Sequence, residues 1–512
     1  MARRLFKARY VLTMGDSPGV VPNGAVITEG GTIREVGPWK ALSRLGPFEE
    51  ELGSLEWDVL MPGFINAHHH CAMGFRDGIP DLPLELWLLY IYGDYKRGMT
   101  EEELYLRTLW VAQEMIRNGI TSVLDLLIGN PRLPMEGAEA VRDAYREAGL
   151  RAALTPMIRD RGELTYGPEP AFVGHLSPAL RDRVRSWLAP QETEVVLASW
   201  ERAFRSLDEG RDGRVRIFMA PQGPQWVSEE LLRRSKALAR DCGTGVQTHL
   251  LETRYQMLYS RRVLGKSLIR QLADLGFLGE EVSLAHCIWL TKDDIRILAQ
   301  EGATAVHNPS QNLRLSDGIA PVAAMLEEGA KVAVGTDGVG IHDDNDLLAD
   351  LRLGMFLQRV PRVAYRPPAA REWFGALYRG GASALRLEGR AGAISPGWLA
   401  DLVLLDGRGA FASPYAHPRL DPAEVVLHRA QGRDVHTVVV GGEVWVRGGR
   451  HVRVDAEKVR ERLERLASAR FSRLEADEKM VGELFSPVAQ HYAAWDETSP
   501  PEAPQFYRFN LV

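Results

Sequence analysis

The sequence predicts an α/β protein in which a central (β/α)8 TIM barrel is flanked by the two parts of a small β-sandwich domain. Three observations favour this fold. Eight short apolar segments alternate with amphipathic helical segments along the middle of the chain, a pattern of short β segments precedes them, and a similar pattern follows them. The chain of 512 residues is long enough, since a barrel of this kind takes about 250 residues. An open doubly wound parallel sheet is the competing fold.

Residues 1–58 are predicted to form the first part of the β-sandwich, because LFKARYVLTM and GAVITEGGTIREVG are alternating stretches broken by Gly, Pro and Asn. Residues 59–388 are predicted to form the barrel. Its strands are expected at residues 59–68, 120–127, 151–158, 215–221, 245–250, 282–287, 303–308 and 331–337. Several intervening helices, such as 228–243 and 291–302, begin at Ser or Thr followed by acids and end at Gly. Apolar strands between such helices indicate a parallel sheet covered on both faces.

Residues 389–452 are predicted to complete the β-sandwich. The stretches LADLVLLD and DVHTVVVGGEVWVRGGRHV resemble strands, and the second carries a Gly-Gly hairpin signal. The chain is therefore expected to leave a β domain, build the barrel and return. Residues 453–512 are predicted to form a charged amphipathic helix followed by a Pro-rich aromatic tail.

The composition disfavours several classes of protein. Lys and Arg number 62 and Asp and Glu number 68, so the net charge of −6 gives no concentrated basic surface for a nucleic acid. The first residues lack the uninterrupted apolar segment of a secretion signal, and no run of about 18 apolar residues follows. No membrane span is expected. Three cysteines are too few for a disulfide framework, so a cytoplasmic protein is predicted, and a homo-oligomer is left open.

Five side chains that can bind a metal ion lie at the carboxyl ends of predicted strands. His68 and His70 end the first strand two residues apart, so they are expected to point to the same face. His249 ends the fifth strand, His286 the sixth and Asp337 the eighth. Because the carboxyl ends of barrel strands meet at one mouth, the five residues are expected to lie together. The sequence therefore predicts a metal site at this mouth.

Five motifs carry a resemblance to a known family. MPGFINAHHH, THLLET, AHCIWLTKDDI, HNPSQNLRLSDGIAPV and VGTDG resemble, in order and spacing, the motifs of the amidohydrolase superfamily. The chain is most similar to the branch that holds the triazine chlorohydrolases and aminohydrolases and the methylthioadenosine/S-adenosylhomocysteine deaminases. The resemblance covers about residues 5 to 450 and leaves out the C-terminal segment.

The resemblance implies a role for each motif residue. One divalent ion, zinc or iron, would be bound by His68, His70, His249 and Asp337. Glu252 and His286 would transfer protons without binding the ion, and Asp337 would also orient or deprotonate the attacking water. His69 is expected to point away from the ion by strand alternation. Members with two metal ions bridge them with a lysine of the fourth strand, which this chain lacks in VRIFMAPQGPQW, so one ion is expected.

These roles predict a metal-dependent hydrolase that acts on C–N bonds. A metal-bound hydroxide would attack an aromatic N-heterocycle, and ammonia would leave after proton transfer through Glu252. Displacement of chloride or an alkylamine from a triazine-like ring, and hydrolysis of a cyclic amide, are alternatives that the metal ligands do not separate. A non-catalytic scaffold is a remote alternative, because every ligand and acid/base position is filled.

Four further residues are predicted to contact the small heterocyclic substrate. Trp87 lies in a long segment after the first strand and offers a ring for stacking. Gln222 and Gln225 follow the fourth strand and His307 ends the seventh, where each could contact ring nitrogens or amino groups. Lys96 stands where the related nucleoside deaminases carry an acid for the ribose hydroxyls. The sequence therefore predicts a preference for a free base over its riboside.

Overall fold

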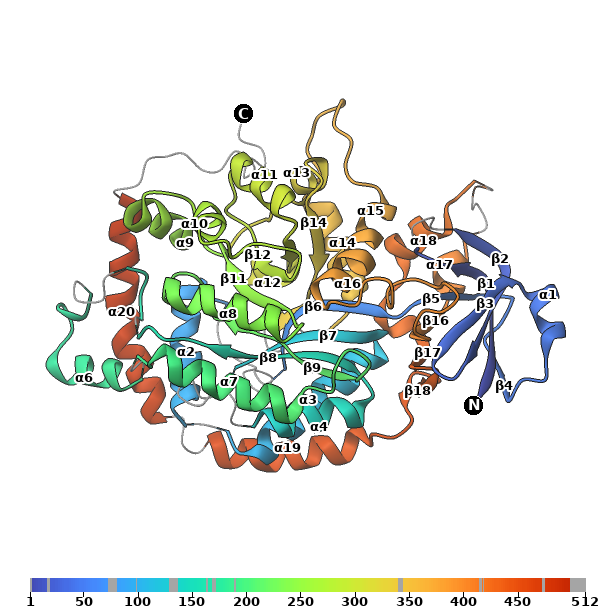
Figure 1. The fold of residues 1–512 in the computed structure, drawn as a ribbon, viewed down its shortest axis with the longest axis horizontal. Helices are drawn as coiled ribbons and strands as arrows, with labels where there is room; N and C mark the ends of the chain where they lie inside the picture. The colour runs from blue at the N-terminus through green and yellow to red at the C-terminus, as the bar shows by residue number, and fades with distance from the viewer. Residues whose placement is uncertain are drawn as a thin grey trace.

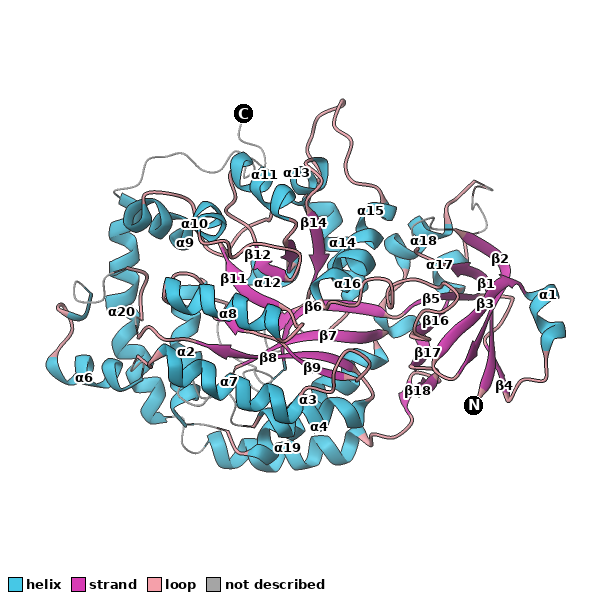
Figure 2. Cartoon of the chain, in the orientation of Figure 1, coloured by secondary structure: helices cyan, strands magenta, loops and turns pink. Residues whose placement is uncertain are grey.

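A nine-stranded sheet at one end of the molecule and two parallel sheets in the middle organise the fold (Figures 1 and 2). The computed structural model describes residues 2–15, 19–71, 81–97, 99–128, 137–162, 164–167, 172–187, 190–338, 344–413, 417, 419–471 and 475–497. Figure 2 shows the parallel strands surrounded by helices, with the nine-stranded sheet beside them. The predicted α/β class is confirmed.

The nine-stranded sheet combines the two ends of the chain. Its strands are β1 (Arg3–Leu12), β2 (Val20–Glu29), β3 (Thr32–Pro38), β4 (Glu50–Leu52), β5 (Asp58–Pro62), β16 (Leu402–Asp406), β17 (Val435–Val440), β18 (Glu443–Arg447) and β19 (Arg450–His451). They lie in the order β19-β18-β17-β16-β5-β1-β2-β3, with β4 beside β1. The antiparallel pair of β16 and β5 joins the two halves. Phe6, Leu60 and Leu402 pack together on one face.

The first predicted strand is two strands in the structure. Residues 58–62 are β5 of the nine-stranded sheet, and the chain continues after Gly63 as β6 (Phe64–His70) of a parallel sheet. At Gly63 the backbone passes so close to the next strand that an added Cβ would lie 2.1 Å from Thr121 Oγ1. Only glycine fits this approach, so the change of sheet occurs here. Residues 59–62, which we assigned to the barrel, therefore pair outside it.

Two parallel sheets form the middle of the molecule. The first contains β6, β7 (Ile120–Leu127), β8 (Arg151–Ile158), β9 (Val215–Ile217), β10 (Ala220–Pro221) and β15 (Asp337–Gly338). The second contains β11 (Val246–Leu250), β12 (Val282–His286), β13 (Thr304–His307) and β14 (Lys331–Val334). A parallel bridge between Met219 and Val246 connects them on one side. On the other side the chain runs from β14 into β15, which pairs with β6.

Helices follow the strands in alternation. Those of the central part are α2 (Leu84–Arg97), α3 (Glu101–Arg117), α4 (Ala138–Ala148), α6 (Pro178–Trp187), α7 (Thr193–Leu207), α8 (Glu229–Asp241), α9 (Arg254–Tyr259), η3 (Ser260–Leu264), α10 (Leu268–Asp274), α11 (Lys292–Glu301), α12 (Pro309–Arg314), α13 (Val322–Glu327), α14 (Leu347–Leu357), α15 (Ala370–Gly375), η4 (Ala376–Gly380) and α16 (Gly381–Ala384). Thr100, Ser228 and Thr291 cap α3, α8 and α11 by accepting a backbone hydrogen bond. Gly302 ends α11 in the left-handed conformation.

The shorter helices and the C-terminal helices complete the structure. Beside the nine-stranded sheet lie α1 (Trp39–Leu42), η1 (Ser43–Leu45), α17 (Arg408–Phe411), α18 (Pro422–Arg429) and η5 (Gly432–Asp434). The C-terminal segment forms two helices, α19 (Ala456–Phe471) and α20 (Glu475–Glu497), where we expected one. The former packs against α3 and the latter against α2. Residues 498–512, the predicted tail, lie outside the described residues. Within the described part of the chain, no helix is both long and apolar enough to cross a membrane.

Candidate metal centre and active site

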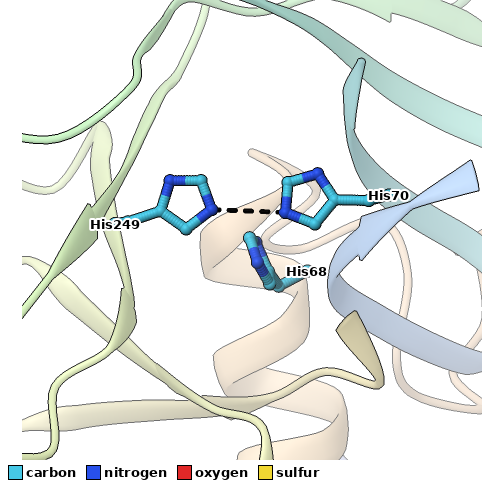
Figure 3. A group of neighbouring side chains, drawn as sticks. All are labelled: His68, His70 and His249. Carbon is cyan, nitrogen blue, oxygen red and sulfur yellow. Dashed lines mark hydrogen bonds between the residues drawn. The ribbon is translucent and has the colours of Figure 1, made fainter. Parts of the chain in front are cut away.

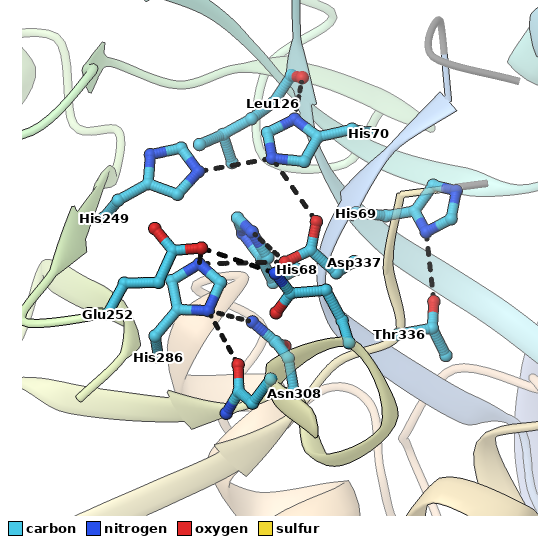
Figure 4. A network of polar contacts seen from close by, with 12 residues as sticks. His68, His69, His70, Leu126, His249, Glu252, His286, Asn308, Thr336 and Asp337 are labelled. Atoms are coloured by element: carbon cyan, nitrogen blue, oxygen red, sulfur yellow. Dashed lines mark hydrogen bonds and ion pairs between the residues drawn. The ribbon is translucent and has the colours of Figure 1, made fainter. Parts of the chain in front are cut away.

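The four predicted metal ligands and His286 lie together near the carboxyl ends of the strands. His68 and His70 come from β6, His249 from β11, His286 from β12 and Asp337 from β15, and all five are buried. The Nε2 atoms of His70 and His249 are 3.2 Å apart (Figure 3). Asp337 Oδ2 lies 3.5 Å from His68 Nε2, and Asp337 Oδ1 lies 3.7 Å from His70 Nε2 (Figure 4). The structure therefore brings together the five residues that the sequence predicted to meet.

The other ring nitrogen of each histidine is held by an acceptor. His68 Nδ1 lies 2.7 Å from Gln247 Oε1, whose amide nitrogen donates to Ala67 O and Ser283 Oγ and so fixes its orientation. His70 Nδ1 lies 2.7 Å from Leu126 O. His249 Nδ1 lies 2.7 Å from Gln222 O. Each Nδ1 therefore carries the proton, and each Nε2 presents its lone pair to the centre of the site.

Burial lowers the pKa of three imidazoles of the site, those of His70, His249 and His286. It lowers the pKa of His70 to about 4 and that of His286 to about 3, even though the nearby Asp337 acts in the opposite direction. Burial and the neighbouring His68 hold the pKa of His249 well below its usual value. Neutral imidazole is the form that binds a metal ion.

The donor set fits a divalent ion. Ligand atoms of His68, His70 and His249 lie within 4.8 Å of one another, and so do those of His68, His286 and Asp337. Among the described residues, the Nε2 atoms of His68 and His286 are buried without a hydrogen-bond partner. Three imidazole nitrogens and a carboxylate are a familiar ligand set for zinc. Burying polar nitrogen atoms without a hydrogen-bond partner costs free energy, and a metal ion bound between them would remove that cost.

Two of these residues have an unusual backbone conformation. His286 has φ 76° and Asp337 has φ 60°, in the left-handed region that residues other than glycine rarely adopt. His286 is the last residue of β12, and Asp337 is the first residue of β15, three residues after the end of β14. Strain of this kind persists where the surrounding structure holds a functional side chain in place.

Glu252 lies beside the histidines at the end of β11. The residue is 4% exposed, and Oε1 is 3.5 Å from His286 Nε2. Gln311 Nε2 donates to Oε1 at 3.4 Å, and Gln256 Nε2 donates to Oε2 at 3.5 Å. Burial, together with the Asp337 and Glu85 carboxylates, raises the pKa of Glu252 well above its usual value. A carboxyl group in these surroundings can hold a proton and release it.

His286 connects the acid to the ligand set. Its Nδ1 lies 3.0 Å from Asn312 Oδ1 and 3.3 Å from Asn308 Nδ2. Its Nε2 faces Glu252 and, at 3.7 Å, Asp337 Oδ2 (Figure 4). His69 points away from this group, with Nδ1 3.0 Å from Thr336 Oγ1, as strand alternation predicted.

A pocket opens beside the metal-binding residues. Its wall includes Glu252, His286 and Asp337 and an apolar side formed by Leu84, Trp87, Leu88 and Ile91 of α2. Of the predicted substrate contacts, Trp87 and Gln222 line this pocket. Gln225 and His307 are buried but do not line it. The side chain of Lys96 lies outside the described residues.

The structure adds polar residues that sequence reasoning did not assign. Gln311 lines the pocket, and its Nε2 lies between Glu252 Oε1 and Asp317 Oδ2 at 3.4 and 3.3 Å. Glu85 is buried in α2 and accepts a hydrogen bond from Thr253 Oγ1 at 2.5 Å. Gln311 and Asp317 belong to the motif HNPSQNLRLSDGIAPV, so the resemblance pointed to their segment but not to their partners.

The fold and the site define the class of metal-dependent hydrolases built on parallel α/β sheets. A model of the amidohydrolase family matches residues 59–445, and the chain belongs to this family. The 5'-deoxyadenosine deaminase of Methanopyrus kandleri is 31% identical over 441 residues, which cover 86% of this chain and 93% of the relative. The 5-methylthioadenosine/S-adenosylhomocysteine deaminase of Desulforamulus reducens is 32% identical over 479 residues, which cover 91% and 100%.

Two solved structures share the fold. An adenosine deaminase from Xanthomonas campestris with bound zinc has a TM-score of 0.76 at 24% identity, covering 91% of this chain and 99% of the other. A triazine hydrolase variant has a TM-score of 0.78 at 22% identity, covering 91% and 100%. The family comparison and the curated relatives confirm the predicted superfamily, its deaminase branch and an aminohydrolase activity.

Proposed function

We propose that this enzyme hydrolyses the amino group from an aromatic N-heterocycle held in the pocket beside Glu252. The observation that carries the proposal is the contact of Glu252 Oε1 with His286 Nε2, next to the imidazole and carboxylate donors of the metal site. The apolar wall of α2 suits a flat ring, and Gln222 is the polar contact that suits a ring nitrogen. The named relatives make adenosine derivatives the first substrates to assay.

The site residues have separate roles in the proposed hydrolysis. His68, His70, His249 and Asp337 would hold one divalent ion, zinc or iron, which supplies a water whose pKa falls to about 7. In the hydrolysis, the oxygen of water would replace the amino group on the ring carbon. Glu252 would pass one proton of the water to the ring nitrogen. The second proton of the water would go to the departing amine, and His286 and Asp337 lie close enough to take part in this transfer. Ammonia leaves, and the ring keeps the oxygen.

The proposal includes the architecture that carries the site. We infer that the two parallel sheets close into one (β/α)8 barrel within the predicted range 59–388, beginning after β5, which belongs to the nine-stranded sheet. The Met219–Val246 bridge and the pairing of β15 with β6 support closure on both sides. Residues 1–58 and 389–452 would form the β-sandwich domain, because the nine-stranded sheet draws on both segments.

Metal analysis and ammonia release test the proposal together. The purified enzyme, supplied with zinc or iron, should hold about one ion per chain and release ammonia from aminated purines, pyrimidines, pterins or triazines. The missing lysine of the fourth strand supports one ion rather than two. Two ions per chain, or none after supply, would contradict the mononuclear site. Chloride or alkylamine release without ammonia release would contradict the deamination.

A further inference from the structure

The C-terminal helix α20 packs against elements that form the active site. It begins at Glu475, beyond the family match to residues 59–445, and no step of the proposed chemistry uses it. Its inner face lies on α2, which walls the pocket, and on α9, which follows Glu252 (Figure 1). Tyr492 on this face is 4% exposed.

Tyr492 and Asp496 hold two segments next to the pocket. The Tyr492 hydroxyl accepts a hydrogen bond from the backbone N–H of Tyr166 at 3.1 Å, and the two rings are 5.6 Å apart. The Tyr492 ring also lies 4.6 Å from that of Tyr255 in α9. Asp496 accepts hydrogen bonds from Arg254 and from the Tyr255 hydroxyl, the latter at 2.8 Å. The helix therefore fixes the 164–167 segment and the start of α9 at once.

A line of hydrogen bonds continues from Tyr166 to Glu252. Gln256 Nε2 donates to the Tyr166 hydroxyl at 3.4 Å. The same Gln256 side chain accepts from the Glu252 backbone N–H at 3.0 Å and donates to Glu252 Oε2 at 3.5 Å. Gln256 is fully buried and Tyr166 is 1% exposed. Because solvent does not reach these groups, a lost partner is not replaced by bulk water.

We propose that Tyr492 is a positioning residue for the reaction, which holds Glu252 in place through Tyr166 and Gln256. This inference rests on the proposed role of Glu252 in proton transfer. Glu252 has two amide donors at 3.4 and 3.5 Å, both long for a hydrogen bond. Its orientation therefore depends on how firmly each amide is held. A misplacement of about 1 Å is enough to slow a reaction severely.

Removal of the Tyr492 hydroxyl tests the inference. Tyr492→Phe keeps the ring but leaves the buried Tyr166 N–H without its acceptor, and kcat should fall roughly threefold to tenfold, the effect of one hydrogen bond. KM and metal content should stay unchanged, because the group acts on proton transfer and not on binding. Tyr166→Phe, which removes the acceptor of Gln256, should give the same loss. Tyr255→Phe is the matched control: it removes a hydroxyl bound to the same helix but outside the line, and kcat should be unchanged.

A double variant shows whether the effect passes through Gln256. In a Gln256→Met background, Tyr492→Phe should cause no further loss of kcat, since the connection is already broken. A kcat of Tyr492→Phe equal to that of Tyr255→Phe would overturn the inference. A double variant whose loss of kcat equals the product of the losses of Gln256→Met and Tyr492→Phe would also overturn it. Glu252→Gln distinguishes a failure of the proposed role of Glu252 from a failure of the positioning role of Tyr492. If that variant stays active, the proposed role of Glu252 fails, whereas an inactive variant beside a fully active Tyr492→Phe contradicts the positioning role alone.

Discussion

Glu252→Gln is the substitution that most directly tests the proposed chemistry. Glutamine has the same volume and can still accept a hydrogen bond from Gln311 at Oε1, which now lies 3.4 Å away. It cannot carry a proton from water to the ring. We therefore expect the variant to fold and to bind metal, and to lose kcat/KM by roughly two to four orders of magnitude, the contribution of a positioned general acid/base.

The size of the loss distinguishes proton transfer from packing. A weakened hydrogen bond of about 1 kcal/mol accounts for only about a fivefold change, so a loss above a hundredfold requires the chemical role. Ammonia release with adenosine derivatives and with free aminated bases is the assay, and elemental analysis confirms the ion. Glu85→Gln is a comparison variant: Glu85 is a buried carboxyl that does not line the pocket and acts on Glu252 through its charge, so the loss of kcat/KM should stay far below that of Glu252→Gln. Activity of Glu252→Gln within about threefold of wild type would refute the reasoning and move the role to His286.

Three further outcomes are expected. His68→Ala or Asp337→Ala should lose both the bound ion and turnover, since each removes a ligand, and full metal content by elemental analysis would show that the ligand set is wrong. Burial raises the pKa of Glu85 from 4.5 to about 7, so the folded protein retains a proton that the unfolded chain releases, and the free energy of unfolding falls as pH rises through this window. Glu85→Gln should therefore match wild type in thermal unfolding near pH 4 and exceed it at pH 8, and an equal difference at both pH values would contradict the shift. Because of Lys96, kcat/KM should be higher for a free base than for its riboside, and Lys96→Glu should narrow the ratio; a wild-type preference for the riboside would overturn this expectation.

The parallel strands and the meeting of the predicted metal ligands were accessible from the sequence for the same physical reason. Parallel strands covered by helices must be apolar on both sides, so the eight predicted segments were recognisable in the sequence. Each segment contains strand structure, although the first, fourth and eighth are each divided between two strands. Once the strands are known, their carboxyl ends are known. His249, His286 and Asp337 were found because each ends a different strand, and topology alone brings such ends together.

The predicted contacts of Gln225 and His307 show where this reasoning stops. His307 ends β13 just as His249 ends β11, yet it does not line the pocket. Its ring lies against α14 instead, since a Cβ on Gly354 would lie 3.4 Å from it. Position at a strand end is therefore insufficient, because the direction of the side chain must also match.

Contacts made by loops and by the last helix could not be predicted from the sequence for a further reason. The partners Tyr492 and Tyr166 are 326 residues apart, and neither lies at a strand end. Their meeting depends on how α20 docks after α19, and a sequence that predicts one amphipathic helix there does not specify a docking face. The same holds for Gln311, whose amide reaches Glu252 because α12 follows β13 closely. Topology thus determines which groups can react, whereas the geometry that holds them depends on packing between distant segments.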